Sequence, residues 1–180
     1  MPSALSHIAV PLTLGLSLGK TNVSNRLIFL SMFCAVMPDF DAVAFTFGIP
    51  YESPFGHRGF THSIFFSLVT AAIATCFSQF LKTKWQMIFI MIFTSTVSHA
   101  LLDALTSGGL GVALWFPFSN ERFFFPWRPI KVSPIGISQF FSEWGLRVIR
   151  SELLWIWLPA SLFTGVLLSM RALTKRQQQN

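Results

Sequence analysis

The stretch WQMIFIMIFTSTVSHALLDAL, residues 85–105, decides the fold, because its only charged residue is Asp103, close to its C-terminal end. An α-helix needs about 20 consecutive, mostly apolar residues to cross the hydrocarbon core of a bilayer. This stretch therefore predicts a membrane span. Three other stretches are also long and apolar enough to span: residues 27–47, 62–81 and 153–170.

A fifth apolar segment, residues 5–19, is shorter and contains Pro11, Gly15 and Gly19. Small residues let membrane helices approach closely, so this segment is either a tightly packed span or a re-entrant one. The sequence thus predicts an all-α fold, a polytopic membrane helical bundle with four to five transmembrane helices. We expect one membrane-embedded domain over residues 1–174, followed by a polar tail, residues 175–180.

The composition agrees with a membrane protein. Of the 180 residues, 52% are hydrophobic and only 11% are charged, whereas a soluble domain carries about 25% charged residues. The net charge of +6 would suit either nucleic acid or an anionic membrane surface. The basic residues lie in loops and at the C-terminus between apolar runs, without a long basic stretch, which favours the membrane. We therefore expect the lipid bilayer, and no nucleic acid, as a partner.

Residues 106–152 differ from the spans because they are rich in aromatic residues, proline and glycine. Aromatic side chains favour the boundary between water and lipid. Hydrophobic residues recur here at helical spacing, which predicts a helix lying in the interface: Ile137, Phe140, Phe141, Trp144 and Val148. The region is either a loop anchored by its aromatic side chains or a lid over a site that opens toward lipid.

The basic residues also predict an orientation. Five spans place most of them on one side: Lys20, Arg26, Lys82, Lys84, Arg171, Lys175 and Arg176. The short connections on the other side carry only Arg58. Lysine and arginine are enriched in cytoplasmic loops, so the basic side should be cytoplasmic, with the N-terminus and residues 106–152 facing outward. Five basic residues within 106–152 count against this orientation.

All four histidines and all three aspartates fall near the outer side of this arrangement: His7, Asp39, Asp41, His57, His62, His99 and Asp103. Ionisable groups are costly inside a membrane unless they are paired or ligated. Hydrogen bonds that merely tie helices together would meet that need, but imidazoles and carboxylates are also the ligands of Zn²⁺, Mn²⁺ and Fe²⁺. We therefore predict a site for one or two divalent ions, with zinc favoured and all seven residues as candidate ligands.

Spacing suggests individual roles. His99 and Asp103 are four residues apart and share one face of a helix, whereas Asp39 and Asp41 diverge on a regular helix. One of these two aspartates would bind metal while the other orients a histidine or binds a second ion. Asp41 or His57 is a further ligand or the general base. Arg58, beside a predicted helix N-terminus, either holds an anion such as a phosphate or anchors the chain at the interface.

These motifs resemble the YdjM-like family of bacterial inner-membrane proteins, which is described as LexA-regulated and as metal-dependent hydrolases. The resemblance extends to about residue 130 and rests on His7, PDFD at 38–41, HRGFTHS at 57–63, SHALLD at 98–103, Thr106 and WFPFS at 115–119. It implies a multi-span protein of the bacterial inner (cytoplasmic) membrane and a metal-dependent hydrolase. Together with the predicted orientation, it places the site on the periplasmic side.

The leading hypothesis is hydrolysis of a phosphoester or phospholipid-like substrate. A bound ion would lower the pKa of a water molecule to about 7 and make it a nucleophile, and Arg58 would neutralise the phosphate. A metal-free lipid phosphatase fits less well, because the segment before His99, TSTVS at 94–98, lacks the arginine that such enzymes carry there. A transporter or a metal-binding structural protein is the alternative. A transport pathway, however, needs polar groups through the whole membrane depth.

Overall fold

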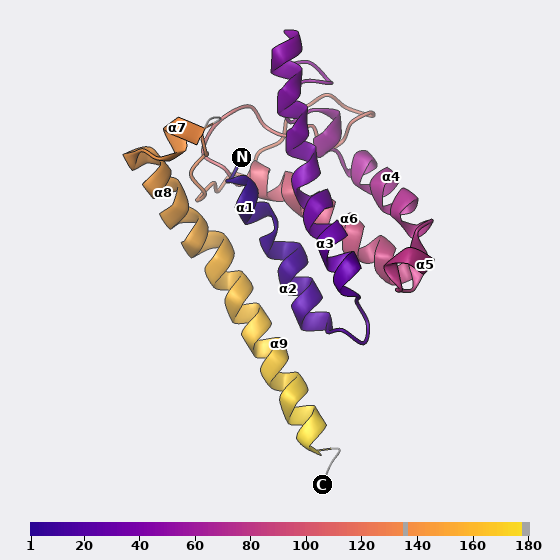
Figure 1. Cartoon of the computed structure of the whole chain (residues 1–180). Helices are drawn as coiled ribbons and strands as arrows, with labels where there is room; N and C mark the ends of the chain where they lie inside the picture. Colours follow the sequence, from indigo (N-terminus) through magenta and orange to yellow (C-terminus); the bar gives the residue numbers. More distant parts are fainter. Residues whose placement is uncertain (135–136, 178–180) are drawn as a thin grey trace.

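The computed structural model describes residues 1–134 and 137–177, and these fold into a bundle of helices (Figure 1). Its elements are α1 (Ala4–His7), α2 (Ala9–Leu18), α3 (Asn25–Val36), the 3₁₀-helix η1 (Met37–Phe47), the 3₁₀-helix η2 (Phe60–His62), α4 (Ile64–Thr75), α5 (Ser78–Leu81), α6 (Trp85–Ala104), α7 (Ile137–Phe140), α8 (Glu143–Glu152), the π-helix η3 (Leu153–Trp157) and α9 (Leu158–Gln177). The predicted all-helical membrane fold is confirmed.

Within the described chain, three helical stretches are long and apolar enough to cross a membrane: Asn25–Phe47, Trp85–Ala104 and Glu143–Thr174. Two shorter apolar helices, Ala4–Leu18 and Ile64–Thr75, complete the bundle. The predicted span 62–81 is therefore shorter than expected. Its first residue, His62, is the last residue of η2. Its helix α4 ends at Thr75 because the next amides bond to carbonyls only three residues back, which tightens the last turn.

The last span begins earlier than expected. The second half of the predicted interfacial helix and the predicted span 153–170 form one continuous column, in which α8 leads through η3 into α9, whereas the first half forms the separate helix α7 (Figure 1). Trp144 and Val148 belong to α8, and Phe140 ends α7. The side chain of Ile137 lies outside the described residues. Most side chains of this column are exposed, as expected for a helix that faces lipid.

The core forms around α6, which packs against α3 and α4. Leu27, Ala71, Ile88 and Met91 belong to its buried apolar cluster. Helix α2 packs between α3 and α9, and a Cβ atom added to Gly15 would lie only 2.6 Å from the side chain of Ile28. The small residue therefore permits the close helix contact that the sequence suggested.

The two ends of the bundle differ in chemistry. At the end away from the N-terminus, Arg26 donates to the carbonyl of Phe80 and Arg171 donates to the carbonyl of Ser17. The first bond joins the start of α3 to α5, and the second joins α9 to the end of α2. Lys20 lies in the α2–α3 connection, and Lys82 and Lys84 lie in the α5–α6 connection. These five basic residues thus lie at one end of the bundle.

Residues 106–134 are bonded to the opposite end. Val112 pairs with Phe123, and the amides of Ala113 and Phe125 donate to the carbonyls of Arg58 and Ala104. The guanidinium of Arg122 donates to four carbonyls, those of Tyr51, Ser53, His57 and Gly111. Because its charge is engaged inside the fold, Arg122 is weak evidence about membrane orientation. Ala113 and Arg122 thus bond this region to residues 51–58.

Candidate metal centre

Two aspartates reach the site from η1. The helix changes from α3 to the tighter η1 at Met37, next to Pro38, which lacks the N–H that an α-helix uses. Asp39 Oδ1 lies 3.8 Å from His62 Nε2, and Asp41 Oδ2 lies 3.1 Å from His62 Nδ1. The two carboxylates diverge, as expected, and the imidazole of His62 lies between them.

Helix α6 supplies His99 and Asp103, which are one turn apart on the same face. His99 Nε2 lies 3.3 Å from Asp39 Oδ1 and 2.9 Å from His62 Nε2. Asp103 Oδ2 lies 3.5 Å from His62 Nε2. Each of the four residues is buried, and each offers one ligand atom that lies within 4.8 Å of the others. The structure therefore brings together four of the seven predicted ligands as one possible metal-binding group.

The contacts of Nδ1 fix the tautomers of His62 and His99. His99 Nδ1 lies 2.7 Å from the carbonyl of Ala35, which can only accept, so this nitrogen carries the proton. His62 Nδ1 faces Asp41 Oδ2 and the hydroxyl of Thr61, whose own proton goes to Asp41 at 2.6 Å. Both contacts of this nitrogen need its proton. With protons on both Nδ1 atoms, the two Nε2 atoms face each other at 2.9 Å and also face two carboxylates. Either a metal cation or a second proton on one imidazole would balance this arrangement.

The separations also suit a metal ion. Nitrogen and oxygen ligands at about 2.0–2.2 Å from a tetrahedral ion lie about 3.3–3.6 Å from one another. Two of the four distances given above are close to this value: 3.3 Å from His99 Nε2 to Asp39 Oδ1 and 3.5 Å from His62 Nε2 to Asp103 Oδ2. Both oxygens of Asp39 and Oδ1 of Asp103 are buried without a hydrogen-bond partner among the described residues, whereas Asp103 Oδ2 has the ion pair with Arg58 Nε. The residues present therefore fit a divalent ion.

His7 joins this centre from the end of α1. Its ring stacks on that of His99 with a centroid distance of 3.7 Å and an interplanar angle of 19°. Its Nε2 lies 3.5 Å from Asp103 Oδ1 and 3.8 Å from Asp39 Oδ2. The structure thus places His7 beside the four-residue group, facing the other oxygen of each aspartate.

Asp41 and His57 form a pair next to this group. His57 Nδ1 lies 2.6 Å from Asp41 Oδ1, while Oδ2 accepts from Thr61 and from the backbone N–H of Arg58. Because both oxygens of Asp41 are bonded, its position suits orienting histidines rather than binding metal. Burial raises the pKa of Tyr51, whose ring lies 5.2 Å from that of His57.

Arg58 does not face an open pocket. Its Nε lies 2.9 Å from Asp103 Oδ2, and its terminal nitrogens donate to the carbonyls of Gly108 and Leu110 and to the hydroxyl of Thr106. The residue is fully buried, with a left-handed φ of 62°. We therefore revise its expected role from binding a phosphate to positioning Asp103.

Two contributions were missed from the sequence. The carbonyl of Ala35 is a backbone group that no motif reveals. Glu152, from the end of α8, is buried and accepts from the amide and hydroxyl of Ser3 and from the hydroxyl of Ser6, which holds the helix that carries His7. The signal that could have found Glu152 was an acidic residue at the start of an apolar span with no basic partner in the following turn.

The chain matches the family described as YdjM inner membrane protein over residues 1–175. Inner membrane protein YbcI of Escherichia coli (strain K12) is 42% identical over 172 residues, which cover 93% of this chain and 97% of that relative. No solved structure matches. Neither name states an activity or a bound metal. The match extends beyond the motifs of the first 130 residues into the last span, and with its apolar helices the chain belongs to the YdjM family of inner membrane proteins.

Proposed function

We propose that this chain is a metal-dependent hydrolase that acts within the membrane on a phosphoester or phospholipid-like substrate. One observation carries the proposal: the Nε2 atoms of His62 and His99 and the carboxylates of Asp39 and Asp103 converge in a buried group while other contacts hold the protons of both imidazoles elsewhere. Such a group is stable only around a positive charge. Zinc suits mixed imidazole and carboxylate ligands, and Mn²⁺ or Fe²⁺ would also fit.

A bound ion would supply Lewis acidity and lower the pKa of a water molecule to about 7. The remaining tasks belong to the chain. Asp41 holds the proton of His57 on Nδ1 at 2.6 Å, which leaves Nε2 as the nitrogen able to accept a proton. We assign proton transfer to His57, and to Asp41 the orientation of both His57 and His62.

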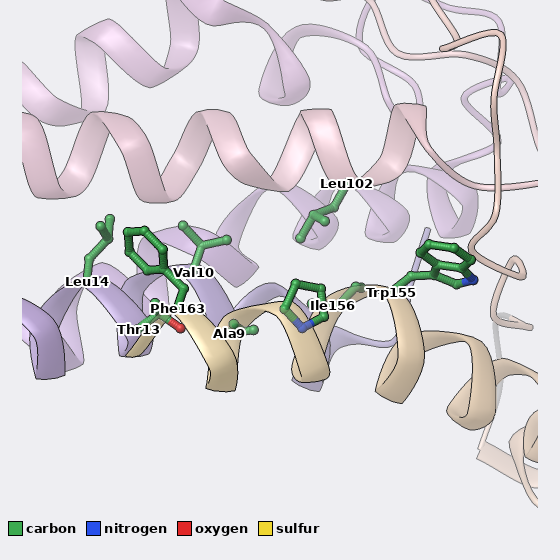
Figure 2. Close-up of a pocket in the computed structure, with 10 residues that line it drawn as sticks. Ala9, Val10, Thr13, Leu14, Leu102, Trp155, Ile156 and Phe163 are labelled. Carbon is green, nitrogen blue, oxygen red and sulfur yellow. The ribbon is translucent and has the colours of Figure 1, made fainter. Parts of the chain in front are cut away.

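A lipid-like substrate is supported by an apolar cavity of about 310 Å³ between α2, α6 and α9, shown in Figure 2. Val10, Phe163 and Trp155 are among its lining side chains, and Thr13 is one of its few polar groups. Two of its lining residues, Ala9 and Leu102, are close in sequence to His7 and Asp103. We propose that an acyl chain lies in this cavity while the headgroup phosphate reaches the metal centre.

We also propose that the site faces the periplasm. Five basic residues, which include Arg26 at the start of α3 and Arg171 in α9, lie at the end of the bundle away from α1, the helix that carries His7 (Figure 1). Positively charged loops are retained on the cytoplasmic side, so the metal centre would lie toward the outer surface.

Turnover of a panel of phosphoesters by detergent-purified protein tests the proposed reaction. We expect hydrolysis that a chelator abolishes and added Zn²⁺ restores, and that is lost in Asp103→Asn. Val10→Trp, which fills the cavity, should reduce turnover of long-chain phospholipids but leave that of a short soluble phosphoester unchanged. Leu5→Trp, at a position 68% exposed in α1, is the matched control. A metal-loaded protein that hydrolyses no phosphoester, or that moves a solute across liposomes instead, would overturn the proposal.

A further inference from the structure

Each metal-facing aspartate has one oxygen that the four-residue group does not use. Asp39 Oδ1 and Asp103 Oδ2 face His62 and His99, whereas Asp39 Oδ2 and Asp103 Oδ1 face His7 Nε2. We infer that His7 and these two outer oxygens form a second metal subsite, so that both aspartates bridge two ions. The inference rests on the proposed function and deepens it from a mononuclear to a dinuclear centre.

The distances at the second subsite repeat those at the first. His7 Nε2 lies 3.5 Å from Asp103 Oδ1 and 3.8 Å from Asp39 Oδ2. Within the described chain, neither of these oxygens nor either ring nitrogen of His7 has a hydrogen-bond partner. The Met1 nitrogen approaches Asp103 Oδ1 only to 4.0 Å. His7 Nε2 and these two oxygens would give the second ion three protein ligands, which is the number that catalytic zinc sites use beside an open position.

The stacked histidine rings favour two ions over one ion with five ligands. His7 and His99 lie nearly parallel at 3.7 Å, yet their Nε2 atoms approach opposite oxygens of the Asp39 carboxylate, at 3.8 and 3.3 Å respectively. A carboxylate that presents one oxygen to each of two imidazoles is placed to bridge two ions, as in two-metal hydrolases.

Charge gives the second ion a task. The negative charge of the three aspartates is offset by one divalent ion, by Arg58 and by the Met1 amino group, which lies 4.0 Å from Asp103 Oδ1. The Arg58 guanidinium is bonded to Asp103 and backbone carbonyls and cannot reach a substrate. A second divalent ion leaves positive charge, which an anionic phosphate would complement. The second subsite thus takes the role that the sequence suggested for Arg58.

The second subsite should bind its ion less tightly than the first. Asp41 and the Ala35 carbonyl fix the tautomers of His62 and His99, but Nδ1 of His7 has no such partner among the residues that the structure describes. Partners of this kind typically change metal affinity about 10–100-fold. We expect two binding steps that differ by a factor in this range.

Titration of the metal-free, detergent-purified protein with Mn²⁺, followed by electron paramagnetic resonance, tests the inference. The unmodified protein should bind about two ions per chain, with a spin-coupled spectrum at saturation, because carboxylates would bridge the ions. His7→Ala should bind about one ion with the spectrum of isolated Mn²⁺, and Leu5→Ala, on the same helix, should behave like the unmodified protein. The number of ions bound by the unmodified protein and their spectrum already test the inference, so the test does not depend on whether His7→Ala folds.

The outcomes separate the two proposals. Saturation of the unmodified protein at about one ion per chain, with the spectrum of isolated Mn²⁺, would overturn the second subsite and leave the proposed hydrolase intact. Saturation at two uncoupled ions would also overturn it, because the bridging aspartates require coupling. A folded protein that binds no ion would overturn both.

Discussion

Replacing Asp41 by asparagine should weaken metal binding although Asp41 is not among the four converging ligands. Its Oδ1 accepts from His57 at 2.6 Å, and its Oδ2 accepts from Thr61 at 2.6 Å and from His62 Nδ1 at 3.1 Å. An asparagine amide presents a donor on one of these two sides, whichever way it is turned. Turned toward His62, it forces the proton of that imidazole onto Nε2, the nitrogen needed for the metal. Turned toward His57, it breaks the hydrogen bond to His57.

The size of the effect follows from the role of Asp41 as the partner that orients His62. Removing a partner that orients a metal-ligating histidine typically costs about 10–100-fold in metal affinity, or about 1.4–2.8 kcal/mol. We expect the Kd for Zn²⁺, measured in detergent by competition with a chelator of known affinity, to rise by a factor in this range. The stoichiometry should stay unchanged, because Asp41 is not itself a ligand.

Glu121→Gln is the matched control, since it removes the same charge from an exposed position in the loop at the same end of the bundle. Its Kd should equal that of the unmodified protein. Thermal melting of the metal-free proteins checks that Asp41→Asn is folded. A folded Asp41→Asn protein with unchanged affinity would refute the reasoning that Asp41 sets the tautomer of His62.

Three further changes test other parts of the structure. Arg58→Met leaves Asp103 charged and buried without its guanidinium partner. The free energy of unfolding should therefore fall by about 3–5 kcal/mol. A melting temperature equal to that of the unmodified protein would contradict this expectation. Glu152→Ala leaves the hydroxyls of Ser3 and Ser6 without their acceptor. This should lower the free energy of unfolding by about 1–3 kcal/mol and weaken metal binding through His7. An unchanged free energy of unfolding would show that α1 is held by other interactions. A cysteine at Asn120, in a variant without the two native cysteines, should react in intact spheroplasts with a maleimide that cannot cross the membrane, and labelling only after lysis would place the site on the cytoplasmic side.

The sequence predicted the helical membrane fold well, because apolar length and the scarcity of charge are local properties. Residues 85–105 correspond closely to α6. The segment 62–81 was predicted less well, since its hydrophobicity does not reveal that the chain before Ile64 forms a 3₁₀ turn that aims His62 at the centre. The continuity of α8 with α9 was also missed, because charged residues in α8 resemble those of an interfacial helix.

For the site, the sequence identified which residues lie together but not which of them would bind a metal and which orient the ligands. His99 and Asp103 were predictable as a pair because helical spacing places them on one face. The roles of Asp41 and Arg58 depend on partners that only the tertiary fold supplies. Asp41 contacts the imidazoles of His57 and His62. Arg58 contacts Asp103, Thr106 and backbone carbonyls. Glu152 reaches Ser3 across nearly the whole length of the chain, a separation over which no local pattern is informative.

The most direct test of the central claim is the metal content of the protein, purified in detergent without a metal-affinity tag and measured by elemental analysis. We predict at least about one divalent ion per chain, as a site with this ligand set requires, and its absence from the His99→Ala, Asp103→Ala double variant but not from Glu121→Gln. Unmodified protein that is folded and free of metal, and that takes up none from Zn²⁺-containing buffer, would contradict the claim. In that case protons alone would hold His62, His99 and the aspartates together.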